Sequence, residues 1–155
     1  MELRKTNSSD VVDCVDLVEA RRLRYEEYEP QFWRRADDSR STSVEWFSNL
    51  FSDVDVLSLV ATEESAVVGF LIARDAPAPP VYNPGGPTAL VDDFCVAEGR
   101  WMDVGKNLLI RAKEELHSSG WTQIVVVGAH KDTEKTSFLE TTTLSLASTW
   151  WTSST

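Results

Sequence analysis

The stretch from Val91 to Leu116 constrains the fold more than any other part of the sequence. It opens with apolar, β-favouring residues, which predict a buried strand ending at Val96. After a turn that holds Gly99 and Arg100, an amphipathic helix is predicted by the apolar positions Val104, Leu108, Leu109, Ala112 and Leu116. A strand that turns directly into a helix leaves backbone N–H groups unpaired beside the positive end of the helix dipole. The turn is therefore a candidate site for a phosphate or another anion.

The acidic composition narrows the classes of partner. The 155 residues predict one domain, residues 1–155, with a formal net charge of −10. A charge of this sign argues against nucleic acid, whose phosphates would be repelled, and mildly favours a cationic partner such as an amine or a basic peptide. Acidic surfaces are nevertheless common, and most of them serve solubility.

The absence of membrane-spanning, signal-peptide and metal-binding patterns indicates the expected compartment and redox state. No apolar run approaches membrane-spanning length, and the N-terminus has no apolar core typical of a signal peptide. We therefore expect a cytoplasmic protein with no membrane partner. Cys14 and Cys95 are expected to be reduced core thiols, and the isolated His117 and His130 offer no metal-ligand spacing. A homodimer is left open.

The order of the other elements predicts a mixed sheet. Strands are expected at residues 2–6, 56–62, 66–74, 121–127 and 144–151, and helices at residues 9–25, 44–51 and 130–141. The loop at residues 75–87 holds five of the six prolines and is expected to be irregular. Antiparallel strands followed by strand–helix–strand units imply an α/β (α+β) fold with helices on both faces of a mostly antiparallel sheet.

With this order of elements, and with Val96, Arg100 and Gly105 ahead of an amphipathic helix, the chain resembles the GNAT superfamily of N-acetyltransferases. The family's loop reads Arg/Gln-x-x-Gly-x-Gly/Ala, and its amides hold the pyrophosphate of acetyl-CoA. The resemblance implies a sheet of about six to seven strands and acetyl-CoA as acyl donor. It implies a cofactor-binding set formed by Phe94, Cys95, Val96, Arg100, Trp101, Met102, Asp103, Val104, Gly105 and Lys106.

Asp103 departs from the family pattern, because it stands where the loop has its middle glycine. A carboxylate about 4 Å from a pyrophosphate oxygen would be repelled by several kcal/mol at an intermediate dielectric. We therefore expect Asp103 to point outward and cap the helix by accepting from the N–H of Lys106. Lys106 could then supply positive charge, and Arg100 is the residue most expected to meet a phosphate.

The general base is sought on the strand that precedes the turn. The family position that commonly holds a carboxylate corresponds to Leu90, which cannot act as a base. In a regular strand Asp92 shares the face of Leu90, and Asp93 is its neighbour. We take Asp92 as the better candidate of the two. The alternative is that one of these carboxylates caps a turn or pairs with an arginine.

The last predicted helix departs further from the family. The tyrosine that often protonates the departing thiolate corresponds to Leu139, the family asparagine to Asp132 and its small residue to Lys135. The Gly-Phe pair that usually follows this helix in the family is replaced by Thr143 and Leu144. A thiolate can leave unassisted, because its basicity is low. Cys95 as a covalent nucleophile lacks a paired histidine, so we interpret it as a core residue.

Two functions of different classes follow from the sequence. The first is an N-acetyltransferase that transfers an acetyl group from acetyl-CoA to a primary amine of a small molecule or peptide by direct attack. The second is a non-catalytic GNAT-fold module that binds acyl-CoA or a protein. A third, weaker reading is an enzyme that uses another acyl donor. In the first reading, residues 25–33 and the loop at 75–87 are expected to flank the acceptor.

Overall fold

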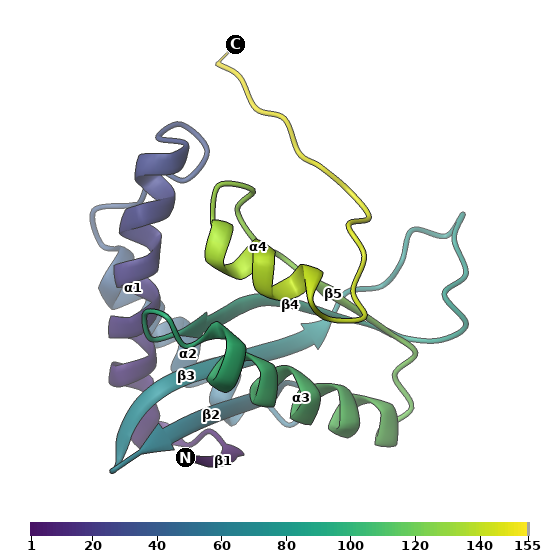
Figure 1. Ribbon diagram of the computed structural model, residues 1–155, viewed down its shortest axis with the longest axis horizontal. Helices are drawn as coiled ribbons and strands as arrows, with labels where there is room; N and C mark the ends of the chain where they lie inside the picture. Colours follow the sequence, from purple (N-terminus) through teal and green to yellow (C-terminus); the bar gives the residue numbers. More distant parts are fainter. Residues whose placement is uncertain (155) are drawn as a thin grey trace.

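The computed structural model describes residues 1–154, which form a five-stranded sheet with helices on both faces (Figure 1). The strands lie in chain order, β1-β2-β3-β4-β5. Their bounds are β1 Glu2–Lys5, β2 Leu57–Glu63, β3 Ala66–Asp75, β4 Thr88–Val96 and β5 Gln123–Val126. The first four strands pair antiparallel, and β5 pairs parallel with β4.

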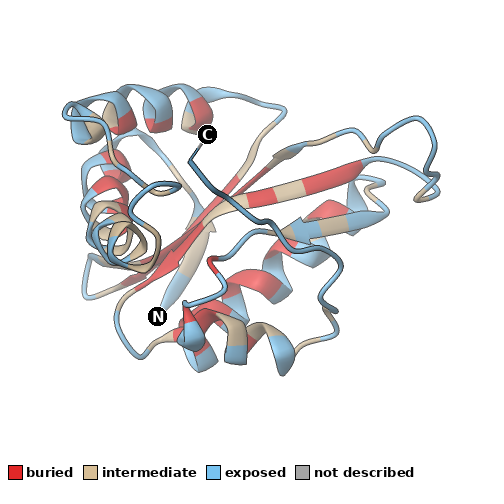
Figure 2. Cartoon of the chain, turned by 90° about the horizontal axis from the view of Figure 1, so that it is seen from above, coloured by how far each residue is buried: buried red, intermediate tan, exposed pale blue. Residues whose placement is uncertain are grey.

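Alternating side chains along the strands build two cores, one on each side of the sheet. Helices α1 (Val11–Tyr28) and α2 (Ser39–Ser52) pack on the face that carries Phe70 and Ile72. Helices α3 (Lys106–Ser118) and α4 (Thr133–Glu140) pack on the opposite face, which carries Leu71. Figure 2 shows the buried residues running along the strands and the inner sides of the helices.

A capped turn fixes the start of α1. Asn7 accepts from the N–H of Ser9, and the Asp10 side chain accepts from the N–H of Asn7 over a short 3₁₀ turn, Ser8–Asp10. The guanidinium of Arg4 in β1 binds both carboxylate oxygens of Asp10 at 2.7 Å. This bidentate contact ties the first strand to the first helix.

A bulge in β4 places Asp93 on the face that carries α1. Leu90 lies opposite Arg74 and Asp93 lies opposite Ile72, so two residues of β4 face the single Ala73 of β3. One extra residue reverses the alternation of side chains from that point onward. Asp93 therefore shares the α1 face with Leu90. Our expectation that Asp92 occupies this face assumed a regular strand, and β4 is bulged at this point.

The structure confirms the fold class and corrects several element bounds. The sheet is mixed and mostly antiparallel with helices on both faces, but five strands are described where six to seven were expected. Helix α1 continues three residues past its predicted end at residue 25, α2 begins at Ser39, and α4 begins at Thr133. The predicted buried strand at 121–127 is a short, partly exposed edge strand, because β5 has a neighbour on one side only.

The predicted final strand at 144–151 is absent from the described residues. This segment alternates apolar and polar residues, but it has no paired neighbour, and Leu146, Trp150 and Trp151 are 88%, 85% and 94% exposed. In Figure 1 it leads away from the end of α4 as an extended chain. Alternation fits a strand only where a sheet edge supplies hydrogen bonds.

The exposed tail predicts that truncation leaves the fold intact. A chain that ends at Ser145 keeps Leu144, which packs against the α3 and α4 core, whereas residues 146–154, which are removed, are exposed in the structure. Its melting temperature should lie within about 2 °C of the full chain, because little apolar area leaves a buried state. Ending the chain at Ser137 instead removes the buried Phe138 and should lower the melting temperature strongly. A large loss in the first variant would show that the tail pairs with the sheet in solution.

Candidate functional site

Strands β4 and β5 part halfway along β4. Their pairing runs from Thr88 opposite Gln123 to Val91 opposite Val126, and a last bond joins the N–H of Val127 to the carbonyl of Val91 at 2.8 Å. Beyond this bond the register of β4 with β5 ends, although β4 continues to Val96. The backbone of Phe94 to Val96 therefore faces a gap. This gap is the place where the resemblance expects an acyl donor.

The ammonium of Lys135 fills the apex of this gap. Its Nζ donates to the carbonyl of Phe94 at 3.3 Å and to the carbonyl of Val127 at 2.6 Å, so it bridges the two separated strands. Lys135 is 2% exposed, and its Nζ lies 5.5 Å from the ring centre of Phe94 and 5.6 Å from that of Trp101. Burial, assisted by the positive charge of Arg21, lowers the pKa of Lys135 to about 8.

A buried polar cluster surrounds Lys135 on the α1 side. The carboxylate of Asp132 forms an ion pair with Arg21 and accepts from the hydroxyl of Tyr25 at 2.9 Å. Asp132 also caps α4, accepting from the backbone N–H of Lys135 at 3.2 Å. Burial and the Asp132 carboxylate raise the pKa of Tyr25. The start of the aromatic segment 25–33 thus lies against the N-terminus of α4.

The turn after β4 is a π-helical segment, Trp101–Gly105, which runs directly into α3. The N–H of Gly105 bonds the carbonyl of Arg100 at 3.1 Å. The indole of Trp101 is buried between Phe94 and Phe138, with ring centres 4.9 Å and 5.5 Å away. A Cβ at position 105 would lie 2.8 Å from Trp101 Cε3. Glycine is required there by the indole, so replacing it with valine would disturb the core as well as the turn.

Asp103 pairs with the arginine of the turn. Its carboxylate accepts from Nε of Arg100 at 2.7 Å, and this contact lowers its pKa. Arg100 also binds Glu63 at 2.8 Å. The predicted cap on Lys106 is wrong, because the N–H of Lys106 bonds the backbone carbonyls of Trp101 and Asp103. The side chain instead pairs with the guanidinium of Arg100.

The two adjacent carboxylates of β4 have different surroundings. Asp92 is 33% exposed and accepts from Arg74 at 2.6 Å. Asp93 is 15% exposed, and the nearest cation, Arg22, lies 3.6 Å away. Burial, with the negative charge of Asp92, raises the pKa of Asp93 to about 6. A carboxyl with this pKa is mostly ionised at neutral pH yet basic enough to accept a proton.

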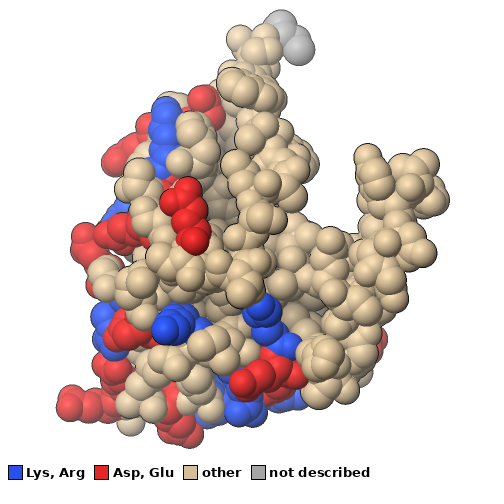
Figure 3. Space-filling view, turned by 45° about the vertical axis from the view of Figure 1, so that its right-hand side comes forward, with Lys and Arg blue, Asp and Glu red and all other residues tan. Residues whose placement is uncertain are grey.

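An open cavity of about 500 Å³ lies where the proline-rich loop meets the sheet. Its walls include Pro79 and Tyr82 of the loop, Leu90 of β4 and Val125 of β5. Leu90 shares its sheet face with Asp93, so the cavity opens on the side of the sheet where this carboxyl lies. Figure 3 shows uncharged surface over the projecting chain segments, and residues 76–87 and 141–154 carry no charged side chain.

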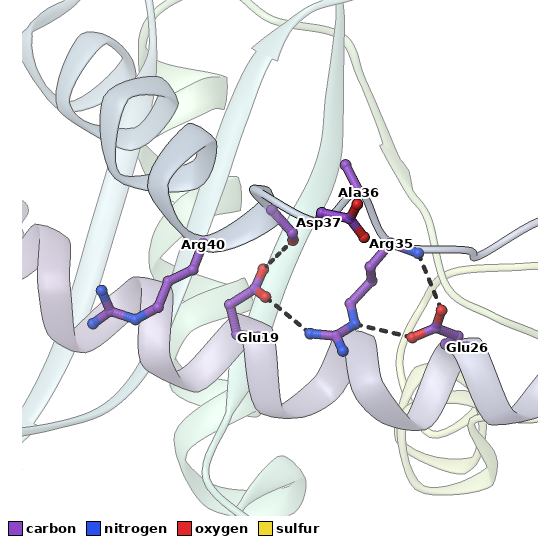
Figure 4. Close-up of a pocket in the computed structure, with 7 residues that line it drawn as sticks. Glu19, Glu26, Arg35, Ala36, Asp37 and Arg40 are labelled. Carbon is purple, nitrogen blue, oxygen red and sulfur yellow. Dashed lines mark hydrogen bonds and ion pairs between the residues drawn. The ribbon is translucent and has the colours of Figure 1, made fainter.

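A second cavity of about 330 Å³ lies between α1 and the segment before α2 (Figure 4). Arg35 crosses it, binding Glu26 at 3.0 Å and Glu19 at 3.3 Å. These ion pairs engage Glu19, Glu26 and Arg35 with one another, and Arg40 pairs with Asp16. Three carboxylates line the cavity beside the two arginines, so it does not favour an anionic ligand.

Other kinds of site are not found in residues 1–154. No cluster of three or more His, Cys, Asp or Glu side chains there could hold a metal ion, and no helix has the length and apolar character needed to cross a bilayer. Both cysteines are buried and unpaired. Burial raises the pKa of the Cys95 thiol, which disfavours its thiolate. Leu139 packs against the α3 and α4 core.

Comparison by sequence finds no matching protein-family model and no matching curated protein. Comparison by structure finds strong likenesses. A mutant of the BH1408 protein of Bacillus halodurans aligns with a TM-score of 0.85 at 12% identity, over 100% of this chain and 99% of that one. A predicted acetyltransferase of Clostridium acetobutylicum with acetyl-CoA gives 0.74 at 17% identity, over 99% and 95%. Aminoglycoside N-acetyltransferase AAC(6')-Iy with CoA gives 0.70 at 13%, over 99% and 93%.

At these identities the likeness establishes the fold. The chain is a mixed α+β protein whose fourth and fifth strands part beside a strand–turn–helix. This is the fold of the GNAT superfamily, and several of the similar structures are described as acetyltransferases.

Because the pKa of Asp93 is raised, replacing this carboxyl with a neutral side chain should stabilise the fold, by an amount that depends on pH. A folded pKa of about 6, above the unfolded value of 3.8, means that ionised Asp93 destabilises the fold, with stability lost as pH rises through 6. In urea unfolding, Asp93→Asn should be about 1–3 kcal/mol more stable than wild type at pH 8, and the gain should shrink at pH 5. Asp92→Asn weakens the contact with Arg74 and should show no such gain. Equal behaviour of the two variants would contradict the assignment of the bulge.

Proposed function

We propose that this protein is a GNAT-type N-acetyltransferase that transfers an acetyl group from acetyl-CoA to a primary amine of a small molecule or peptide by direct attack. The observation that carries the proposal is Asp93, a buried carboxyl of raised pKa where β4 bulges and parts from β5. It lies on the sheet face of the 500 Å³ cavity under the proline-rich loop. That cavity is the acceptor site of the proposal.

The main chain fits an acyl-CoA, whereas two side chains occupy the places that the ligand would take. The open edge of β4 at Phe94 to Val96 would pair with the pantetheine arm, and the N–H groups of the turn Trp101 to Lys106 would hold the pyrophosphate. In the structure, Lys135 donates to the carbonyl of Phe94, and the Asp103 carboxylate lies at the turn, paired with Arg100. The fit therefore requires both side chains to move away.

Asp93 serves as the general base in this proposal. The attacking amine must lose a proton as its nitrogen bonds to the thioester carbon, and an ionised carboxylate on the acceptor side can take that proton. The adjacent Asp92 and the strongly negative net charge favour a cationic amine near this point. Asp92 is held by Arg74 and serves as a source of negative charge rather than as the base.

A second candidate is a GNAT-fold module that binds acyl-CoA or a protein without catalysis. Two observations favour it. Leu139 stands where a proton-donating side chain would be expected, and Lys135 closes the apex of the gap. If Lys135 stays in the gap when ligand is present, the protein keeps the GNAT fold but does not catalyse acetyl transfer.

Replacing the base separates the two candidates. Asp93→Asn should lower the rate of thiol release from acetyl-CoA by about 10²–10⁴-fold with a good amine acceptor, because general-base assistance is removed. Asp92→Asn, its matched control, should lose much less. Ligand binding is followed separately by thermal stability, since acetyl-CoA at about 100 times its Kd adds about 2.7 kcal/mol. Stabilisation without thiol release, across a panel of alkyl, aryl-alkyl and peptide amines, would support the non-catalytic module instead.

The turn can be tested through its own carboxylate. Asp103→Ala should tighten the binding of acetyl-CoA by about tenfold, or about 1.4 kcal/mol, because a negative charge beside the turn is removed and Arg100 is released. Glu63→Gln is the control, since it also loosens Arg100 but leaves the Asp103 carboxylate in place. Calorimetric titration measures both variants. Equal or weaker binding by the Asp103 variant would mean that the pyrophosphate does not use this turn.

A further inference from the structure

The apex of the gap is rich in buried hydrogen-bond donors. Besides the Lys135 ammonium, Nε1 of Trp101 and Nε of Arg21 are buried without any acceptor. Trp101 is 3% exposed, and the Arg21 guanidinium lies 4.9 Å from its ring centre. Buried N–H groups are normally paired, because an unpaired one costs about 1–3 kcal/mol. Unpaired donors beside a gap indicate a place for an electron-rich ligand atom.

The charged groups around the apex are of both signs. Two cations, Lys135 and Arg21, lie beside Trp101, and the carboxylate of Asp132 pairs with Arg21. The titratable and charged groups that face Lys135 come from α1, β4 and the N-cap of α4: Arg21, Tyr25, Asp132, Asp93 and Cys95. Burial holds the Tyr25 hydroxyl and the Cys95 thiol in their neutral forms. Because Asp132 is paired with Arg21, the Lys135 ammonium is the cation that donates into the gap, where it would stabilise a negative charge that develops there.

Lys135 also lies close to the position at which a proton donor is missing. Leu139 carries no proton, but Lys135 lies one turn earlier on α4, so the two side chains share a helix face. The long side chain of Lys135 reaches the apex of the gap, where its ammonium meets the backbone of both strands. The bond to Phe94 is the longer of the two, 3.3 Å against 2.6 Å, and is the one that a pantetheine amide would replace.

We propose that Lys135 is the proton donor to the departing thiolate of the acyl donor, in place of the side chain absent at Leu139. The proposal rests on the transferase function proposed above. As the amine nitrogen bonds to the thioester carbon, the C–S bond breaks and its electron pair stays on sulfur. One proton passes from Nζ of Lys135 to that sulfur, and the proton of the amine passes to Asp93. Nζ–H of Lys135 and Nε1–H of Trp101 stabilise the charge on sulfur as it forms.

The environment of Lys135 suits this role. Its pKa of about 8 lies near the pKa of an ordinary thiol, so transfer in either direction is nearly balanced. After transfer the neutral amine remains in a buried site beside Arg21, which disfavours a second cation. Lys135 regains its proton when product leaves and solvent enters the gap.

The test compares Lys135→Met and Lys135→Arg with wild type and with Lys113→Met, an exposed lysine of α3. Thiol release from acetyl-CoA is measured from pH 5.5 to 9.5 with the best amine of the panel, and acetyl-CoA binding by calorimetry. Wild-type kcat should rise through about pH 6 with Asp93 and fall through about pH 8 with Lys135. Lys113→Met should match it.

Lys135→Met should lose about tenfold or more in kcat at pH 7, with the fall above pH 8 abolished. Lys135→Arg keeps the charge but holds its proton, so it should recover part of kcat and also lack the fall above pH 8. If the methionine variant does not fold, the profile of the arginine variant carries the test. A purely structural lysine would change stability without changing the shape of the profile.

Three outcomes would overturn the proposal. A methionine variant with unchanged or higher kcat and tighter acetyl-CoA binding would show that Lys135 only blocks the gap, with the transferase function intact. A wild-type profile retained in the arginine variant would assign the fall above pH 8 to another group. No thiol release by wild type with any amine would overturn the transferase function as well. If wild type is active and the Lys135 variants keep its kcat and pH profile, only the proton-donor role of Lys135 is overturned.

Discussion

The Lys135 ammonium, buried between two separated strands, is the interaction on which the second half of the structure depends. Where β4 and β5 stop pairing, backbone carbonyls would be left facing an empty gap, and Lys135 satisfies those of Phe94 and Val127. The cation lies beside the rings of Phe94 and Trp101, and the backbone N–H of Lys135 donates to Asp132 at the start of α4. The position of α4, the closed gap and the chemistry that we infer for it all follow from this one buried charge.

The gap and the turn share a principle, because in each the chain's own side chain stands where a ligand group would bind. Lys135 donates to a strand carbonyl as an amide of an acyl donor could, and Asp103 accepts from Arg100 as a phosphate could. Structures with acetyl-CoA and with CoA are among those that share this fold. In the function that we propose, ligand binding is an exchange of partners, and its apparent affinity scales with the fraction of molecules in which the site is open.

Sequence reasoning reached the fold through patterns that depend on near neighbours. The strand–turn–helix around Gly105 was predicted because apolar period, glycine and helix polarity are all local signals. It failed at the tail, since the alternation of residues 144–151 indicates a strand but says nothing of whether a sheet edge is available. It also failed at Asp103, whose partner Arg100 is itself held by Glu63, a residue 37 positions away.

The sequence by itself determined the class of fold, the order of its elements and the residues from which any site must be drawn. Only the tertiary structure decided that Asp93 lies on the same sheet face as Leu90, because a one-residue bulge in β4 reverses the side-chain alternation and its register is set by pairing with β3. Only the tertiary structure brought Lys135 to Phe94, 41 positions earlier in the chain. Local patterns encode elements, whereas the ionisation of a buried group depends on everything folded around it.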